Sequence, residues 1–205
     1  MHIEILTFIL YNIFMKITIF NFKGGQGKTT ISLALALSYG FFIITNDEYS
    51  PINKILLKGH AKHLKQGEKL PNVPDDLPVI YDFNLCSDER IIEALNLSSW
   101  VIIPLVYDSP LDMQVTIKTI REIEQHNKKI LIILNKSKKG DFEKANKVLN
   151  NFFNYPILEL KQSTAFIKII EKKKSLQKLM EENKLLENSY KKPVDQLQAI
   201  KNFIS

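Results

Sequence analysis

The sequence predicts an α/β fold with a doubly wound, mainly parallel sheet flanked by helices. Short β-rich runs bounded by turn residues alternate with longer segments whose apolar residues recur at helical spacing. Several runs, such as residues 100–106, are continuously apolar, which is typical of strands covered by helices on both faces. This alternation implies right-handed crossovers and a ligand site at the carboxyl ends of the strands.

The predicted elements follow one another in a regular order. Strands are expected where β-branched and aromatic residues gather, at 16–21, 41–45, 78–82, 100–106, 130–135 and 156–160. Helices are expected where apolar residues recur every three or four positions, at 29–39, 51–65, 88–97, 111–126 and 141–153, with two or three more after Ser163. Residues 69–78 hold three prolines and predict a surface loop. Residues 175–188 predict a core-facing amphipathic helix, with a partner-binding helix as the alternative.

The length of 205 residues suits one domain with a sizeable core, which we expect to span residues 15–205 and to end in basic helices. Residues 1–14 are mostly apolar but lack the basic start and the cleavage site of a secretory signal. Because Met15 directly precedes the first strand, we expect this extension to reflect a start codon placed too early. An accessory strand or a short amphipathic anchor is the alternative.

The chain is basic, with a formal net charge of +6 and a pI near 9.2. Residues 161–205 hold 10 lysines against 5 acidic residues, so this segment is a candidate anion-binding face. Solvated lysines in a lysine-rich composition are the alternative. No apolar run approaches the roughly 20 residues of a membrane-spanning helix, and we expect a cytoplasmic protein. The single cysteine, Cys86, excludes a paired-cysteine metal site within one chain.

The segment Lys23-Gly24-Gly25-Gln26-Gly27-Lys28-Thr29-Thr30 has the composition of a phosphate-binding loop. Glycines let successive backbone N–H groups turn toward phosphate oxygens, a lysine reaches the β- and γ-phosphates, and a hydroxyl binds Mg²⁺. The loop follows a predicted strand and opens a predicted helix, whose N-terminus favours an anion. The ordinary pattern has glycine where this chain has Phe22, and Lys23 is an additional lysine.

This segment resembles the deviant Walker A box of the ParA/MinD family of ATPases, and the chain is most similar to its small plasmid-type members. The resemblance implies ATP and Mg²⁺ as cofactors and a homodimer that forms when ATP binds. Lys23 matches the lysine that crosses to the phosphates of the partner subunit, so Lys23 and Lys28 are candidate catalytic residues. The loop residues expected to bind the nucleotide are Gly24, Gly25, Gln26, Gly27, Lys28, Thr29 and Thr30.

The resemblance continues at the second strand, which in the family ends in an Asp-x-Asp box. Thr45-Asn46-Asp47 occupies that place, so Asp47 matches the aspartate that positions the attacking water and is the third candidate catalytic residue. Thr45 replaces the first aspartate and Glu48-Tyr49 replaces the usual Pro-Gln. A slow or altered ATP-hydrolysis switch is therefore an open alternative. Without the family, Asp47 is interpreted as a helix cap before Pro51.

Two further strands end in polar residues that match family positions. Asp82 resembles the Walker B aspartate, which reaches Mg²⁺ through a bound water, and Thr29 is the other expected metal-binding residue. Asn135 stands where relatives have a residue that contacts adenine, with a cap of the next helix as the alternative. Residues 135–138 lack the aspartate of a guanine-reading NKxD box, which favours adenine.

The family's tasks imply three functional hypotheses. The first is an ATP-dependent ATPase for plasmid or chromosome partition that coats nucleoid DNA without sequence preference and leaves it after hydrolysis stimulated by a centromere-binding ParB-like protein. Its DNA-binding residues are expected in the densest lysine cluster, which comprises Lys168, Lys172, Lys173 and Lys174. The second is a MinD-like ATPase that positions cargo or docks on a membrane through residues 191–205, although we expect no stable membrane association. The third is a non-enzymatic nucleotide-binding scaffold.

Overall fold

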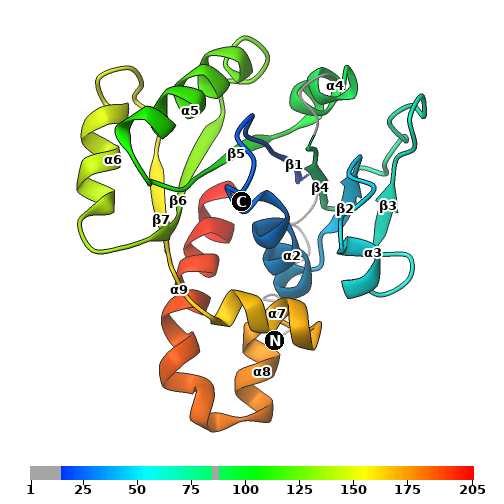
Figure 1. Ribbon diagram of the computed structural model, residues 1–205. Helices are drawn as coiled ribbons and strands as arrows, with labels where there is room; N and C mark the ends of the chain where they lie inside the picture. The colour runs from blue at the N-terminus through cyan, green and yellow to red at the C-terminus, as the bar shows by residue number, and fades with distance from the viewer. Residues whose placement is uncertain (1–14, 85–87) are drawn as a thin grey trace.

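The computed structural model forms one sheet of seven parallel strands in the order β3-β2-β4-β1-β5-β6-β7 (Figure 1). The structure describes residues 15–84 and 88–205, so the predicted extension at 1–14 and Cys86 lie outside the described residues. The strands are β1 (Lys16–Ile19), β2 (Phe42–Thr45), β3 (Ala61–His63), β4 (Val79–Asp82), β5 (Trp100–Leu105), β6 (Ile130–Ser137) and β7 (Ile157–Lys161). The predicted doubly wound parallel sheet is confirmed.

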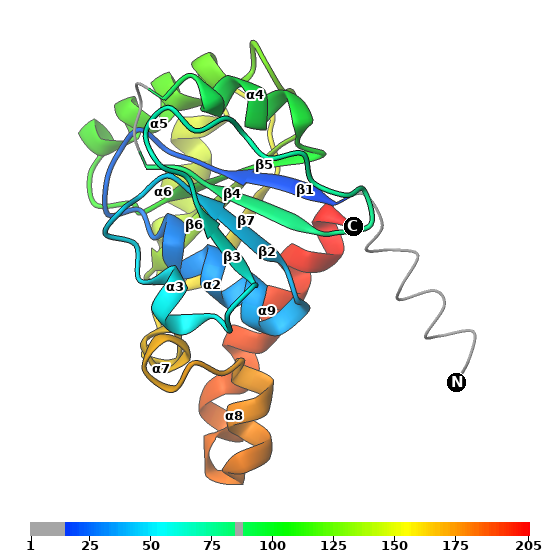
Figure 2. The ribbon, with the colours of Figure 1, turned by 90° about the vertical axis from the view of Figure 1, so that its right-hand side faces the viewer.

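Helices cover both faces of this sheet (Figure 2). One face carries α2 (Lys28–Tyr39), α3 (Ile52–Ile55), α7 (Ala165–Lys172), α8 (Leu176–Glu182) and α9 (Glu187–Ile204). The other face carries α4 (Arg90–Leu97), α5 (Pro110–Ile123) and α6 (Asp141–Leu149), and a 3-10 helix, η1 (Lys184–Leu186), joins α8 to α9. Among the described helices, none is both long enough and apolar enough to cross a membrane.

Each central strand contributes to two apolar cores, because successive side chains of a strand point to opposite faces. In β4, Ile80 packs in the core below α2 and Tyr81 packs in the core below α4. In β5, Ile102 and Ile103 are divided in the same way, and both are completely buried. Burial on both faces explains why these strands are continuously apolar in the sequence.

The C-terminal helix α9 is part of the core. Its residues Leu197, Ile200 and Ile204 are at most 2% exposed and lie in the core on the α2 side. Phe203, on the same helix, packs edge-on against Trp100, with ring centroids 5.1 Å apart. The helix closes one side of the sheet with its apolar residues.

The helix predicted at residues 51–65 is wrong over most of its length. Only Ile52–Ile55 is helical, and Ala61–His63 is an edge strand that pairs in parallel with β2. Leu56 is already extended, and Gly59 turns the chain with a φ of 88°, a value that favours glycine. The apolar spacing is therefore helical for one turn only. The rest of the segment forms a turn and the edge strand β3.

Strand register brings the predicted site residues to one edge of the sheet. Asp82 lies in register with Ile19 of β1 on one side and with Thr45 of β2 on the other. Residues in register point to the same face, which for Asp82 is the face covered by α2. The glycine-rich loop leaves β1 at this same edge, so the loop and both predicted acidic residues are neighbours.

Candidate nucleotide-binding site

The glycine-rich loop ends at the N-terminus of α2, which is twelve residues long and begins at Lys28. Gly27 precedes the helix with a φ of 88°, and its carbonyl accepts the first helical hydrogen bond, from Ile31 N at 3.0 Å. A Cβ at Gly27 would collide with the Nδ2 of Asn135, whereas one at Gly24 would meet open space. Only glycine fits at position 27, for backbone and for packing reasons. The first N–H groups of α2 are suited to bind an anion.

Two side-chain amides hold the loop in this shape. Gln26 is 2% exposed, and its Oε1 accepts a hydrogen bond of 2.6 Å from Val106 N, just beyond β5. Asn135, in the last half of β6, donates from Nδ2 to the Gln26 carbonyl at 2.8 Å. The loop is therefore tied to two strands on one side, which fixes the direction of its backbone N–H groups before any anion binds.

Asn21 is a third anchor, and the sequence patterns did not single it out. Its completely buried Nδ2 donates to the Pro104 carbonyl at 2.8 Å, and its Oδ1 accepts from Lys23 N at 2.9 Å. Thr116 and Thr119 of α5 complete this network, at 3.2 Å each. Asn21 thus fixes the backbone at Lys23, and it has partners 83 to 98 residues away. Such distant partners leave no local signal in the sequence.

Lys28 and Asp82 place opposite charges below the loop. Lys28 is 7% exposed and its Nζ donates to the Asn21 carbonyl at 3.1 Å. Asp82 is 2% exposed, and its Oδ2 has no hydrogen-bond partner among the described residues. Burial raises the pKa of Asp82 to about 6; hydrogen bonding by the Thr29 hydroxyl and the charge of Lys28 oppose the increase, and Asp47 adds to it.

The residues around Asp82 fit a magnesium ion held together with phosphates. Within residues 15–84 and 88–205, no group of three His, Cys, Asp or Glu side chains could hold a metal on its own. Mg²⁺ is usually bound through one or two carboxylates, waters and substrate phosphates. The buried Oδ2 of Asp82, beside the Thr29 hydroxyl, supplies a hard oxygen ligand without another partner in the described chain. Thr29 and Asp82 would hold the ion.

Asp47 lies beyond β2 and is half-buried. Its Oδ2 accepts from the Asn84 side chain at 3.4 Å, and its Oδ1 accepts from Tyr49 N at 3.0 Å. Its backbone N–H donates to the Thr45 hydroxyl at 3.2 Å. The short helix α3 is preceded by Pro51 and has no side-chain cap. Asp47 therefore stabilises the turn before that helix and keeps a carboxylate at the carboxyl edge of the sheet.

A polar wall supports Asp47 on the side of α4. Asn46 donates to Asp88 Oδ2 at 2.6 Å and accepts from Asn84 N at 2.9 Å. Arg90 donates to both oxygens of Asp88, at 2.8 and 2.6 Å, and this hydrogen bonding is the main cause that lowers the pKa of Asp88 to about 2. A cavity of about 830 Å³ opens along this wall. The sequence patterns singled out neither Asp88 nor Arg90.

The other predicted residues have distinct surroundings. Asn135 is buried and holds the loop, so contact with an adenine base stays a prediction for it. Lys168 pairs with Glu171 at 2.7 Å and Lys174 pairs with Glu182 at 2.6 Å. Lys172 and Lys173, at the end of α7, are exposed.

Solved structures share this fold over most of the chain. Apo McdA from Cyanothece has a TM-score of 0.67 at 13% identity, covering 93% of this chain and 99% of that one. The MinD cell division protein from Aquifex aeolicus has a TM-score of 0.61 at 14% identity, covering 91% and 96%. A putative plasmid partition protein from Borrelia burgdorferi bound to AMPPNP has a TM-score of 0.51 at 17% identity, covering 78% and 90%.

No protein-family model and no curated protein matches the chain. The structural likeness nevertheless covers more than 90% of this chain for McdA and for MinD. The chain has the fold of the ParA/MinD-type ATPases. The expectation of a ParA/MinD-type fold is therefore confirmed.

Asp82→Asn is expected to remove a pH dependence of stability. A carboxylate whose pKa is raised in the folded state destabilises the fold as pH rises through the interval from its ordinary value to about 6. The free energy of unfolding of the variant, relative to wild type, should increase by about 2 to 3 kcal/mol between about pH 4 and about pH 7. Denaturant unfolding without nucleotide and Mg²⁺ measures this, and a pH-independent difference would contradict it.

Gly27→Ala is expected to destabilise the protein by about 1 to 3 kcal/mol and to abolish ATP binding, because its Cβ meets Asn135 and its φ is strained. Gly24→Ala is the matched control, since a Cβ there meets open space at a φ that alanine tolerates. Thermal and denaturant unfolding compare the two variants. Equal losses of stability would show that the Asn135 contact does not restrict position 27.

Proposed function

We propose that this chain is an ATPase of the ParA/MinD type that dimerises on ATP and serves DNA partition. The observation that carries the proposal is the loop itself: a rigid phosphate cradle with Lys28 and Asp82 buried below it and an additional lysine, Lys23, at its start. The shared fold supports ATP as the substrate, since a protein with this fold was solved with AMPPNP.

The residues below the loop have complementary roles in this proposal. The backbone N–H groups of the loop and Lys28 bind the phosphates of ATP. Thr29 and Asp82 hold Mg²⁺, which when bound neutralises charge on the phosphate oxygens. Asn21, Gln26 and Asn135 keep the loop in position, so little reorganisation is needed at the moment of reaction.

Lys23 and Asp47 are proposed to act on the reaction itself. Lys23 crosses to the phosphates of a second copy and stabilises the charge that develops there, so that hydrolysis requires the dimer. Asp47 positions the attacking water, with Asn84 fixing its carboxylate. Thr45 stands where the family has an aspartate, and its hydroxyl is used by the backbone of Asp47. We expect turnover to be slow because of this substitution, and we propose that a partner protein stimulates it.

DNA, rather than a membrane, is the proposed surface on which the protein works. The tail that could dock on a bilayer is α9, and its apolar residues Leu197, Ile200 and Ile204 are buried in the core. The lysine excess of residues 161–205 favours phosphate-rich partners. In this proposal the ATP-bound dimer lies on the nucleoid in the cytoplasm, and a ParB-like centromere-binding protein releases it by stimulating hydrolysis.

Lys23→Ala and Asp47→Ala should each keep ATP binding and reduce turnover by at least about a hundredfold. Mixing the two variants tests whether Lys23 acts across the dimer. In a mixed dimer, one site combines an intact Asp47 with an intact Lys23 from the other copy, so part of the activity should return. Lys144→Ala, on the distant helix α6, is the control and should hydrolyse ATP normally. If the mixture recovers no activity, Lys23 acts in the active site of its own subunit.

DNA retention should appear with ATP and be lost with ADP. Because the contacts are to phosphates, the affinity should fall linearly with salt on logarithmic axes. Fluorescence anisotropy with a labelled duplex of arbitrary sequence measures both effects. Retention on anionic vesicles in place of DNA would favour the membrane-positioning alternative. If the wild type hydrolyses no ATP, even with DNA and the partner present, the non-enzymatic nucleotide-binding scaffold is the remaining hypothesis.

A further inference from the structure

A second concentration of lysines lies far from the C-terminus, at the edge of the sheet. Residues 54–69 hold five lysines and two histidines against one glutamate. The structure places them on α3, on the edge strand β3 and in the adjoining loops. The helix predicted at residues 51–65 does not continue beyond Ile55, so these lysines do not share a helix face. They instead lie along one edge of the molecule.

The ion pairs show which lysines are available to an external anion. Lys62 is paired with Glu68 at 2.7 Å. Lys54, Lys58 and Lys65 are exposed and make no ion pair within the described residues. The same holds for Lys172 and Lys173 at the end of α7, whereas Lys168 and Lys174 are neutralised by glutamates. We call five of these exposed lysines without an ion pair the basic edge; they are Lys54, Lys58, Lys65, Lys172 and Lys173.

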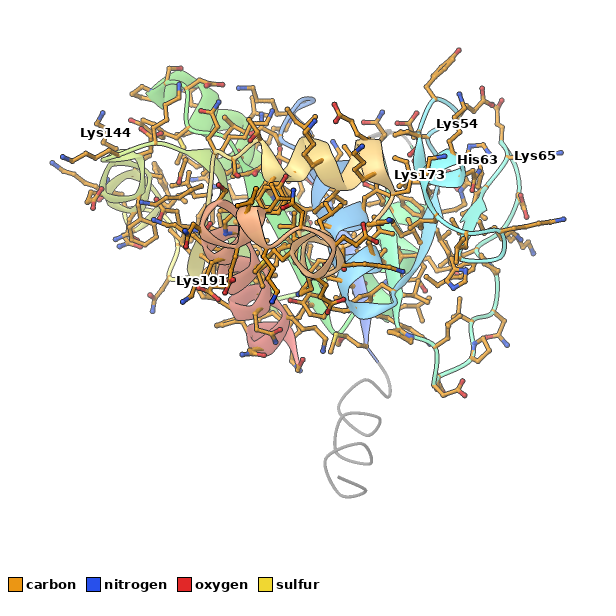
Figure 3. All side chains as sticks on the ribbon, turned by 90° about the horizontal axis from the view of Figure 1, so that it is seen from below. Lys54, His63, Lys65, Lys144, Lys173 and Lys191 are labelled. Carbon is orange, nitrogen blue, oxygen red and sulfur yellow. The ribbon has the colours of Figure 1, made fainter. Side chains whose placement is uncertain are left out.

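The two parts of the basic edge lie on the same side of the molecule. Helices α3 and α7 are neighbours on the same face of the sheet (Figures 1 and 2). Figure 3 shows Lys54, Lys65 and Lys173 toward one side, and Lys144 of α6 at the opposite end of the sheet. The basic edge therefore joins the end of α7 to the β3 edge.

The position of this edge is fixed by the wall beside Asp47. Arg90, which binds Asp88, also donates from Nη1 to the carbonyl of Lys65 at 3.0 Å and to that of Glu68 at 2.7 Å. The loop after β3 is thereby attached to α4. A cationic surface on such a fixed backbone loses less conformational entropy when it binds than a disordered tail does.

We propose that the basic edge binds the phosphate backbone of duplex DNA. This inference rests on the proposed DNA-partition function and names the surface that carries its DNA contact. Residues 54–65 contain no Phe, Tyr or Trp, so they lack the aromatic rings on which single-stranded bases stack. Leu57 is the one exposed large apolar side chain among them, which offers a bilayer little to insert. A surface of cations with few exposed apolar side chains suits a duplex backbone better than a bilayer.

The test compares two triple variants with equal changes of charge. The first, Lys54→Ala/Lys58→Ala/Lys65→Ala, removes the β3 part of the basic edge. The second, Lys144→Ala/Lys147→Ala/Lys191→Ala, removes three exposed lysines of α6 and α9. Duplex affinity is measured by anisotropy with ATP at several salt concentrations between about 50 and about 200 mM. Binding of a fluorescent ATP analogue and the unfolding midpoint show that each variant is folded.

The edge variant should bind the duplex at least about tenfold more weakly and show a salt slope smaller by about 2 to 3, since each phosphate contact contributes about 0.9 to that slope. The control variant should keep the wild-type slope within about 1. Replacing the three edge lysines by arginine should preserve binding.

The outcomes separate this inference from the proposed function. If wild type binds the duplex with ATP and the two alanine variants are equally weakened, or the edge variant is unchanged, the inference is overturned and the partition function stands. If wild type binds no duplex, both are overturned. Vesicles of equal parts phosphatidylcholine and phosphatidylglycerol identify the third case. Binding to them that the edge variant loses, without binding to DNA, would assign the surface to a membrane.

Discussion

The rest of the site depends on one constraint: the backbone N–H groups of the glycine-rich loop, which lies outside any helix or strand, must point toward an anion. Three buried amides hold these groups in place: Asn21 just before the loop, Gln26 within it and Asn135 in β6. Each such hydrogen bond contributes only about 1 kcal/mol net to stability. Their larger effect is on geometry. Because the parallel strands end at one edge of the sheet, all three amides lie beside the same loop.

This arrangement carries a cost that the surrounding core must offset. Asp82 places a carboxylate oxygen in a buried position without a hydrogen-bond partner in the described chain, and Lys28 is nearly as buried. Strand register explains why the positions cannot move, since Asp82 is held between Ile19 and Thr45. The two apolar cores, with fully buried residues such as Ile80 and Ile102, supply the stability that such a site consumes.

The sequence predicted the parts of the molecule that are local. Six of the seven strands were expected from runs of β-forming residues, and the phosphate-binding loop from a contiguous motif in its strand–loop–helix context. β3 was missed because its three residues have little β propensity and exist as a strand only through pairing with β2. Asn21 and Arg90 were missed for a related reason, since an isolated polar residue acquires its role only from partners that folding brings to it.

The β3 edge has a further consequence for how copies of the protein behave toward one another. A strand that pairs on one side only presents unsatisfied N–H and C=O groups, which can recruit a strand from another chain. Lys62 on β3 and the lysines that flank it oppose such sheet extension by charge repulsion and by their hydration. The charge of this edge therefore opposes aggregation when many copies are close together. A polyanion that neutralises these lysines removes that protection, so it must also cover the unpaired edge of β3.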